Sequence, residues 1–395
     1  MYQIKGRFQH YDWGGFTFMP ALFNINNSDN KPFAEYWLGV HSGGPTTVAL
    51  NAETKTSLDA LINSNKPLYL GKQLWKQFDK LPFLLKILDV RKMLSIQVHP
   101  NKMAAEAGFL RENEAKIPLN ASFRNYKDDN HKPEIMVALS DFWLLHGFAS
   151  NIQERLDQYV FLNPFKQAYR EDGIRGLYQA IMNLSQAEVN DLLGAQMEKA
   201  LDQYTAGELK KTAPDYWAAR ACIDFKNGSD YDKGIFSIYL FNIVNLNPGQ
   251  GIFQGAGMPH AYMEGQNIEL MSNSDNVLRG GLTNKHIDVK ELMNNTLFVE
   301  TVPHILEGDL ELSRASYKAP VDDFQLTYYL MESGQQLEMQ VDKPSVILMT
   351  EGQVKWISES KEIDSFGVDA LYVHPGECIR IESCSISRLF VASTG

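Results

Sequence analysis

The chain has 395 residues, of which 44% are hydrophobic and 22% charged, proportions that are ordinary for a globular protein. This length exceeds one average domain, so two or three structural units are expected. The formal net charge of -11 argues against nucleic acid or an anionic membrane as the main partner, although a local cluster of basic side chains can still bind a small anion.

The sequence also carries signals about the cellular compartment. The N-terminal residues do not begin a signal peptide, and no apolar run has the length needed to cross a bilayer. The three cysteines, Cys222, Cys378 and Cys384, are few and lack metal-ligand spacing. We therefore expect a soluble, cytoplasmic protein with reduced cysteines.

Two predicted strands precede the first candidate ligands. Residues 34–41 alternate as a strand does, and Glu35 and His41 belong either to a site or to a solvent-facing side; for His41 a structural role is favoured. Residues 81–90 form a strongly apolar strand that contains one lysine, Lys86. Such a lysine is paired, lines a cavity or extends outward at the edge, so Lys86 is a candidate for holding an anion.

Residues 94–100 predict a short strand that ends in polar side chains. Side chains two positions apart project from the same face of a strand, so Gln97 and His99 point together while Val98 faces the core. A pair placed in this way can aim two ligands at a metal in the mouth of a β-barrel. Asn101 has the chemistry of a helix N-cap, and residues 102–116 are rich in helix formers.

Residues 130–134, with the sequence NHKPE, precede a buried strand predicted at residues 135–139. Pro133 keeps the residue before it out of the helical region, so this segment is expected to be extended. Lys132 and Glu134 then share one face and His131 takes the other. Taken alone, Lys132 and Glu134 are equally well interpreted as an ion pair.

Residues 150–227 have a helical pattern, with apolar side chains recurring three and four positions apart. Ser185 and Thr205 each stand three residues before a glutamate, which predicts a capping box at both positions. No cluster of chemically active residues falls in this segment, so it is interpreted as a helical insertion that forms a wall or lid. Residues 235–246 then predict a strand again.

A second group of candidate site residues follows this strand. His260 comes after a stretch of glycines and Pro259 that is expected to present it at a strand edge. Glu269, Asp275 and Arg279 lie close together along the chain, and two glycines beside Arg279 allow the backbone to approach a ligand. From residue 298 onward the pattern is β-rich, as in a second barrel-like domain that lacks metal ligands.

Four of these residues form a candidate metal site: Gln97, His99, Glu134 and His260. Two imidazoles, one carboxylate and one amide oxygen suit a borderline divalent cation, zinc first. Gln97 is the least usual ligand among them. Each of the four lies at the end of a predicted strand, as a site in a barrel mouth requires.

Four segments of the chain resemble the type I phosphomannose isomerase family, which are zinc enzymes of the cupin superfamily. These are residues 97–100 (QVHP), 126–134 (YKDDNHKPE), 257–262 (GMPHAY) and 274–283 (SDNVLRGGLT). The resemblance implies one zinc ion per chain on Gln97, His99, Glu134 and His260. It also implies that Arg279 lies in the active site, with Lys132 and Asp275 nearby.

The resemblance further implies a mainly β fold. A cupin or jelly-roll catalytic domain is expected over residues 1–149 and 228–320, with the α-helical insertion at residues 150–227. A second, jelly-roll-like β domain is expected over residues 321–395. The expected state is a monomer or weak homo-oligomer.

The activity implied by the family interconverts mannose 6-phosphate and fructose 6-phosphate through a cis-enediol. A metal can polarise the carbonyl, and a base must take the proton beside it. Lys132 and His131 are candidate bases, with Asp275 and Glu269 as competitors, and the sequence does not choose between them. Arg279 suits the enediolate or the phosphate.

The expected partner is therefore a phosphorylated hexose. Lys86 and Lys285 are candidates for the phosphate, and Glu269 and Tyr262 are further candidates for contact with the substrate. Two alternatives are an iron-dependent cupin oxygenase and a sugar-binding cupin without activity. Gln97 in a fourth ligand position, with Lys132 and Arg279, argues against the oxygenase, and the intact ligands beside Asp275 and Arg279 argue against the binding protein.

Overall fold

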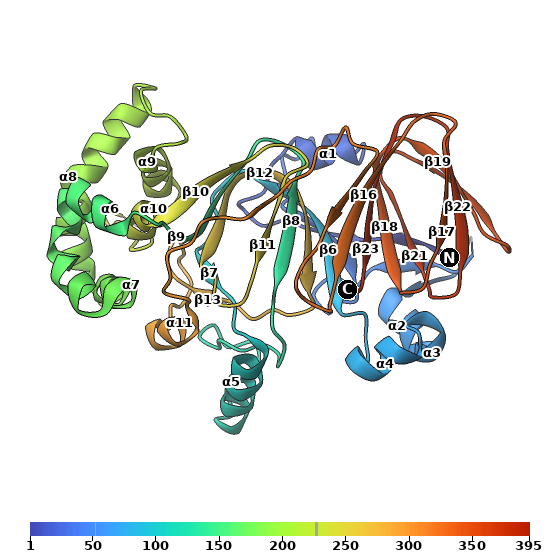
Figure 1. Ribbon diagram of the computed structural model, residues 1–395, viewed down its shortest axis with the longest axis horizontal. Helices are drawn as coiled ribbons and strands as arrows, with labels where there is room; N and C mark the ends of the chain where they lie inside the picture. The colour runs from blue at the N-terminus through green and yellow to red at the C-terminus, as the bar shows by residue number, and fades with distance from the viewer. Residues whose placement is uncertain (52, 226–227) are drawn as a thin grey trace.

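Antiparallel strands form most of the middle and the C-terminal part of the chain, and helices gather at one end (Figure 1). This arrangement is seen in a computed structural model that describes residues 1–51, 53–225 and 228–395. The expected mainly β fold of cupin type is confirmed. Within the described residues the sheets face each other in layers and do not close into a continuous barrel.

The central sheet contains the strands that carry most of the candidate site. In spatial order its strands are β14 (Ile305–Leu306), β11 (Gly251–Gln254), β8 (Glu134–Ala138), β12 (His260–Ser272), β6 (Phe83–Val90), β3 (Glu35–Gly39) and β2 (Arg7–Gln9). A second layer is made by β9 (Phe142–Phe148), β10 (Phe241–Leu246), β7 (Gln97–Val98) and β13 (Leu278–Arg279). Strand β12 is long enough to belong to both layers, so it connects them.

The change of layer along β12 occurs at a glycine. His260 to Glu264 pair with β9, and Gly265 to Ser272 pair with β6. Gly265 has a φ of 123°, a conformation that favours glycine, and a Cβ there would lie 2.7 Å from the carbonyl oxygen of Asp141. Gly265 therefore lets one strand begin in the second layer and continue in the central sheet.

Both faces of the central sheet are covered. One face packs on the C-terminal sheet, where Ile87 and Ile268 share a core with Leu348 and Tyr372. The opposite face packs on the second layer through a smaller apolar cluster that includes Leu88 and other residues of β6, β8, β9 and β12. Because strand side chains alternate between faces, every second residue of β3, β6, β8 and β12 points into the space between the two layers.

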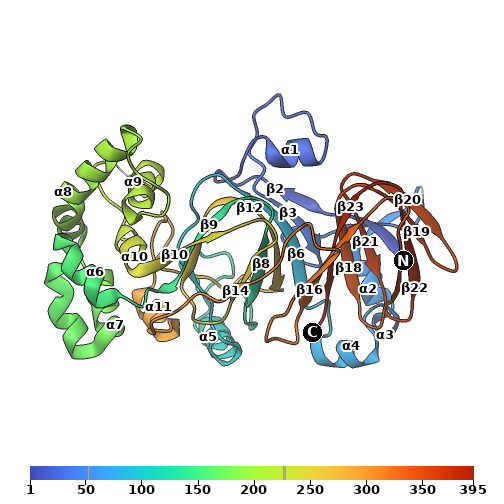
Figure 2. The ribbon, with the colours of Figure 1, turned by 45° about the horizontal axis from the view of Figure 1, so that its top comes forward.

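The C-terminal part contains two further sheets. The larger has the order β15 (Arg314–Tyr317), β16 (Gln325–Met331), β23 (Ser387–Ser393), β18 (Ser345–Glu351), β21 (Asp369–Val373), β1 (Tyr2–Lys5), β4 (Thr47–Ala49) and β5 (Lys55–Ser57). The smaller has the order β17 (Gln336–Gln340), β22 (Cys378–Ser383), β19 (Gln353–Ile357) and β20 (Glu362–Phe366). Three N-terminal strands thus complete a C-terminal sheet, and the N-terminus lies beside these strands in Figure 1 and Figure 2.

The helices at the end of the molecule pack against β9 and β10 (Figure 1). They are α6 (Ile152–Gln158), the 3-10 helix η1 (Val160–Phe165), α7 (Lys166–Met182), α8 (Gln186–Thr205), α9 (Pro214–Phe225) and α10 (Ile235–Leu240). The predicted strand at residues 235–246 is wrong in its first half, because residues 235–240 form α10 and the strand begins at Phe241. All six residues of α10 are buried, and a short run that is apolar on every side does not distinguish a helix from a strand.

The remaining helices lie between or beside the sheets. They are α1 (Phe18–Leu22), α2 (Leu58–Ser64), α3 (Lys66–Tyr69), α4 (Lys72–Phe78), α5 (Lys102–Glu114) and α11 (Val289–Asn295). The predicted cap of α5 is confirmed, since the Asn101 side chain accepts a hydrogen bond from the Ala104 amide at 2.9 Å. Among the described residues, no helix combines the length and the apolar character required to span a membrane.

The two predicted capping boxes can be compared directly. Ser185 forms one at the start of α8, with reciprocal hydrogen bonds to Glu188. The prediction for Thr205 is wrong, because Thr205 is the last residue of α8 and its hydroxyl donates back to the carbonyl of Leu201. The spacing to a glutamate is the same at both positions, so only the helix boundary separates them.

Replacing Ser185 with alanine is expected to lower the free energy of unfolding by about 1 kcal/mol, because the N-terminal amides of α8 lose their acceptor. Urea denaturation of the two proteins measures this difference. The matched control is Thr205→Ala, which removes a hydroxyl at the other end of the same helix and should change stability by well under half that amount. Equal losses in the two variants would contradict the assignment.

Candidate metal centre and adjoining cavity

Four charged side chains point from the central sheet into the space between the layers. They are Glu35 on β3, Lys86 on β6, Glu269 on β12 and Glu134 on β8, and all four are buried. Their neighbours one position along each strand pack on the opposite face of the sheet, as the period of two requires. Glu35 was expected either in a site or facing solvent, and the structure places it inside.

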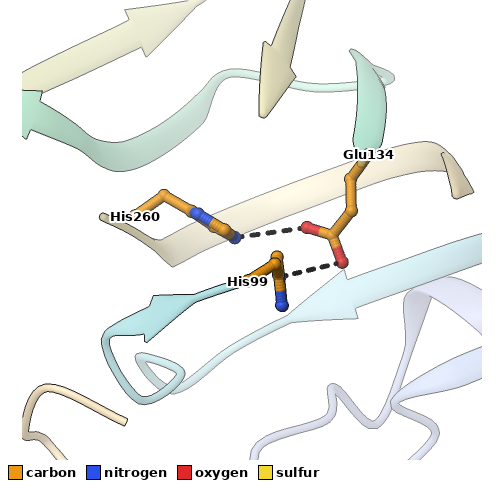
Figure 3. Close-up of side chains that lie close together, drawn as sticks. All are labelled: His99, Glu134 and His260. Carbon is orange, nitrogen blue, oxygen red and sulfur yellow. Dashed lines mark hydrogen bonds and ion pairs between the residues drawn. The ribbon is translucent and has the colours of Figure 1, made fainter. Parts of the chain in front are cut away.

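His99, Glu134 and His260 form the only group of potential metal ligands found in the described residues, and their ligand atoms lie within 4.8 Å of one another. Glu134 lies between the two imidazoles, with Oε1 3.4 Å from His99 Nε2 and Oε2 3.2 Å from His260 Nε2 (Figure 3). The three side chains come from the β7–α5 connection, β8 and the first residue of β12. The predicted cluster is therefore assembled in space.

The imidazoles are oriented for metal binding by their other nitrogens. His99 Nδ1 lies 2.8 Å from the carbonyl oxygen of Asn276, and His260 Nδ1 lies 2.9 Å from that of Met258. A carbonyl only accepts, so each Nδ1 carries the proton and each Nε2 has a free lone pair. His99 Nε2 is buried without a hydrogen-bond partner, which is the state expected of an atom that binds a cation. These donors therefore fit zinc.

Gln97 lies beside this group. It is opposite His260 in one strand pairing and opposite Arg279 in another, and its half-buried side chain lines the same small cavity as Glu134 and His260. An amide oxygen is a weaker metal ligand than the three other groups, so its position is compatible with a fourth ligand without requiring it.

Electrostatics keep Glu134 ionised and His99 neutral. Burial alone disfavours the carboxylate, but the charge of Lys132, whose Nζ lies 2.8 Å from Oε1, outweighs it, so the pKa of Glu134 is well below its usual value. Burial lowers the pKa of His99 to about 4, and the Lys132 charge acts in the same direction. Anionic carboxylate and neutral imidazole are the protonation states that bind a divalent cation.

Lys86 belongs to a separate ion-pair network in the same space. Its Nζ lies 2.8 Å from Glu269 Oε2 and 3.4 Å from Glu35 Oε2, and Trp37 Nε1 also donates to Glu35. Although burial disfavours the ammonium, these two carboxylates raise the pKa of Lys86 above its usual value. The pKa of Glu269 is raised by burial. Lys86 therefore stays positively charged, and the carboxylates of Glu35 and Glu269 compensate its charge.

Tyr262 completes one wall of this space. Its hydroxyl is buried, and burial followed by the charges of Glu269 and Glu134 raises its pKa well above the usual value, so the phenol is neutral. His146 lies opposite His260 in the pairing of β9 with β12. Its Nδ1 lies 2.8 Å from Gln254 Oε1, and burial lowers the pKa of His146 to about 4.

Two other candidate residues are held by partners that are distant in sequence. His131 Nε2 lies 3.1 Å from both carboxylate oxygens of Asp323, which also accepts from Ser272. Asp275 Oδ2 lies 3.1 Å from His41 Nε2. The pKa of Asp275 is lowered, since the hydrogen bond and charge of His41 outweigh burial. His41 therefore binds a residue of the candidate site. The sequence did not predict this contact, because it shows His41 only as a single histidine in a strand.

The candidate site opens through two cavities that share a wall. The smaller, of about 100 Å³, is lined by residues that include Lys132, Glu134, His260 and Glu269. The larger, of about 470 Å³, shares Glu35, Leu94 and Gln97 with it. A ligand with a charged end and a reactive end can therefore occupy both.

The larger cavity is lined by three cations and by three carboxylates, those of Asp12, Glu35 and Asp224. Arg279, Lys285 and Lys92 all line it, and none of their side chains has an ion-pair or hydrogen-bond partner among the described residues. Burial lowers the pKa of Lys285, and the charge of Arg279 contributes. Cations without an ion-pair partner in one cavity are candidates for binding an anion. Sequence reasoning found Arg279 and Lys285 but missed Lys92, whose surroundings gave no signal.

The layered β fold and the His-Glu-His group define a metal-binding protein of the cupin class. A family model described as the phosphomannose isomerase type I catalytic domain matches residues 1–151. The mannose-6-phosphate isomerase of Escherichia coli (strain K12) is 35% identical over 385 residues, covering 95% of this chain and 93% of its own. That of Saccharomyces cerevisiae is 31% identical over 396 residues, covering 89% and 88% respectively.

Solved structures agree with this relationship. A crystal structure of a variant of phosphomannose isomerase from Salmonella typhimurium has a TM-score of 0.89 and 30% identity, covering 100% of this chain and 99% of that one. A zinc-bound mannose 6-phosphate isomerase has a TM-score of 0.87 at 30% identity, with the same coverage. The chain belongs to the type I phosphomannose isomerase family, and the resemblance seen in the sequence is confirmed.

The stability of the metal-free protein is expected to fall as the pH drops from about 6.5 toward 4. His99 and His146 have pKa values of about 4 in the folded chain, against 6.5 ordinarily, so in this window the unfolded chain binds protons that the folded chain does not. Each histidine accounts for about 3 kcal/mol of this loss. Urea denaturation at a series of pH values measures it.

The control for this pH dependence is His146→Gln, which retains a hydrogen-bonding amide at the position and has no proton to gain. Its free energy of unfolding should fall less steeply with decreasing pH than that of the unmodified chain. An unchanged slope would show that His146 is not held neutral in the folded state.

Proposed function

We propose that the chain is a zinc-dependent aldose-ketose isomerase that interconverts mannose 6-phosphate and fructose 6-phosphate through a cis-enediol. The observation that carries this proposal is a His-Glu-His group whose cavity adjoins a second cavity with unpaired cations. Relatives named mannose-6-phosphate isomerase and a zinc-bound relative support it. No observation favours the oxygenase or the non-catalytic sugar-binding alternative.

In the proposed site, His99, Glu134, His260 and Gln97 hold one zinc ion, which supplies Lewis-acid polarisation of the carbonyl when bound. The phosphate occupies the larger cavity, beside Arg279, Lys285 and Lys92, which form no ion pair among the described residues. The sugar carbons then lie toward the smaller cavity. This placement separates the group that anchors the substrate from the carbons that react.

The reaction requires a base that removes the C2 proton of the aldose and returns it to C1, while the hydroxyl proton moves from O2 to O1. We propose Lys132 for this role. It lines the smaller cavity and has one charged partner, Glu134. We propose that Glu134 gives up this contact when it binds a cation, and that Lys132 then accepts the proton as a neutral amine. The other candidates are engaged elsewhere: His131 by Asp323, Asp275 by His41, and Glu269 by Lys86.

Lys86, Glu269 and Tyr262 line the smaller cavity together. We propose that they contact the sugar hydroxyls, with Lys86 donating while its two carboxylate partners keep it charged. Arg279 lies where the two cavities meet through Gln97, so it reaches either the phosphate or the developing enediolate.

The proposal extends to the organisation of the chain. A cupin catalytic domain covers residues 1–149 and 228–320, a helical insertion covers 150–227, and a C-terminal β domain covers 321–395. The enzyme acts in the cytoplasm as a monomer or weak homo-oligomer. Two of its cysteines are exposed thiols, Cys378 at the start of β22 and Cys384 just after its end, which suits a reducing compartment.

Removing the metal is expected to abolish isomerase activity, and adding zinc back should restore it. A coupled assay that follows fructose 6-phosphate from mannose 6-phosphate measures both steps, and metal analysis confirms the loading. Glu134→Gln should lose the metal, because its amide keeps one oxygen but not the negative charge. Full activity after exhaustive chelation would refute the proposed function.

Lys285→Ala is expected to raise KM for mannose 6-phosphate about tenfold or more while changing kcat little, because a phosphate contact is the same in the ground state and the transition state. Initial-rate kinetics separate the two parameters. The matched control is Lys290→Ala, an exposed lysine on the nearby helix α11. A loss confined to kcat would instead place Lys285 at the reacting carbons.

A further inference from the structure

The connection that carries the candidate phosphate-binding residues has an unusual backbone. Leu282 has a φ of 54°, a left-handed conformation that side chains with a Cβ rarely adopt, and the residue before it, Gly281, has a φ of 122°. Leu282 is nearly fully buried. Arg279 precedes these two residues and Lys285 follows them, so the strained turn sets the separation of two cations.

A single carboxylate stabilises this turn. Asp232 Oδ1 accepts hydrogen bonds from the Leu282 amide at 2.6 Å and from the Gly234 amide at 2.7 Å, and Oδ2 accepts one from the Thr283 amide at 3.0 Å. Asp232 lies just before α10, at the end of the helical group. Its two oxygens thus hold two consecutive amides of a turn that is 50 residues away in the chain.

The surrounding backbone confirms how closely the two segments fit. A Cβ on Gly281 would overlap the Cα of Gly234, so the chains approach each other directly. On the other side, Gly281 O accepts from the Ile96 amide at 3.0 Å, and the Gly280 amide donates to Ile96 O at 2.9 Å. The turn is therefore held between the strand that carries Gln97 and the helical group.

The hydrogen bonds continue from the carboxylate to the lysine. Thr283, whose amide is bound by Asp232, accepts a hydrogen bond through Oγ1 from the Lys285 amide at 3.1 Å. Leu282, Thr283 and Lys285 all line the larger cavity. Neither Arg279 nor Lys285 has an ion-pair partner among the described residues, so their spacing depends on the backbone between them.

We infer that Asp232 is a positioning residue that fixes the turn between Arg279 and Lys285 for a phosphorylated substrate, which makes the segment leading into α10 part of the phosphate site. This inference rests on the proposed function. Asp232 does not touch the substrate, and its effect passes through the amides of Leu282 and Thr283. The expected consequence of losing it is weaker phosphate binding with little change at the metal.

The test uses the full zinc-loaded chain with Asp232→Asn. The amide retains one oxygen for Leu282 and Gly234 but presents an N–H to the Thr283 amide, where two donors oppose each other. KM for mannose 6-phosphate and the inhibition constant of inorganic phosphate are both expected to rise about tenfold, which is typical of the loss of one charged hydrogen-bonding arrangement. The value of kcat is expected to stay within about twofold of that of the unmodified chain. Zinc content is expected to stay the same.

The matched control is Asp230→Asn, which makes the same charge change two residues away. Asp230 accepts a hydrogen bond from Asn190 and does not contact the turn. Its KM and its phosphate inhibition constant should match those of the unmodified chain. Hydrogen exchange at the amides of residues 282–283 should accelerate in the Asp232 variant alone.

Three results would overturn the inference. The first is unchanged phosphate affinity in Asp232→Asn despite faster exchange at residues 282–283, which would show a purely structural role. The second is an equal loss in Asp230→Asn, which would show a general charge effect. The third is a loss of kcat and of bound zinc in Asp232→Asn as large as the loss of phosphate affinity, which would show that the metal site is also disturbed. If Asp232→Asn does not fold, Asp232→Glu, which keeps both acceptors on a longer side chain, must show the selective rise in the phosphate inhibition constant.

The affinity for inorganic phosphate tests the role of Asp232, and the isomerase assay tests the proposed function, so failure of one can be distinguished from failure of the other. A chain without isomerase activity that still binds inorganic phosphate more weakly after Asp232→Asn would refute the proposed function and keep the positioning role. A chain that has isomerase activity but whose phosphate binding is unchanged by Asp232→Asn would keep the proposed function and refute the positioning role. Binding of inorganic phosphate is measured by calorimetry when no turnover is available.

Discussion

Charge compensation on the inner face of the central sheet is the constraint on which the rest of the site depends. Three carboxylates, Glu35, Glu134 and Glu269, share a buried space with two lysines, Lys86 and Lys132. An isolated charge in such a place costs several kcal/mol, so each group needs a close partner. The formal sum of three negative and two positive charges leaves one negative charge in excess. A divalent cation reverses that sign, and the reversed sign suits an oxyanion.

The layered fold makes this cluster possible. Strand β12 starts in the second layer with His260 and continues into the central sheet with Glu269, changing layer at Gly265. One strand thus connects the histidine of the metal group with the ion pairs of Lys86. Because β3, β6 and β8 flank the same strand, their alternate side chains meet in one space.

The parts outside these two layers act on the site through the connections between strands. The C-terminal part contributes Asp323, which binds His131 next to Lys132. The helical group contacts the β12 strand through Glu264, which is paired with Lys211 and Arg220, and contacts the turn after β13 through Asp232. Catalytic positions that come from short strands and turns need such support, since few hydrogen bonds of their own hold them.

The sequence by itself determined what depends on neighbours along the chain. The period of two in a strand correctly placed Lys132 and Glu134 on one side, where their charged atoms lie 2.8 Å apart, and the residue types predicted the His-Glu-His group. Tertiary structure decided the rest. Whether residues 235–240 are helix or strand, and whether Lys86 meets carboxylates or solvent, depends on what packs around them. His131 and Asp323 are 192 residues apart, and no local pattern encodes a contact that only the packing of separate sheets creates.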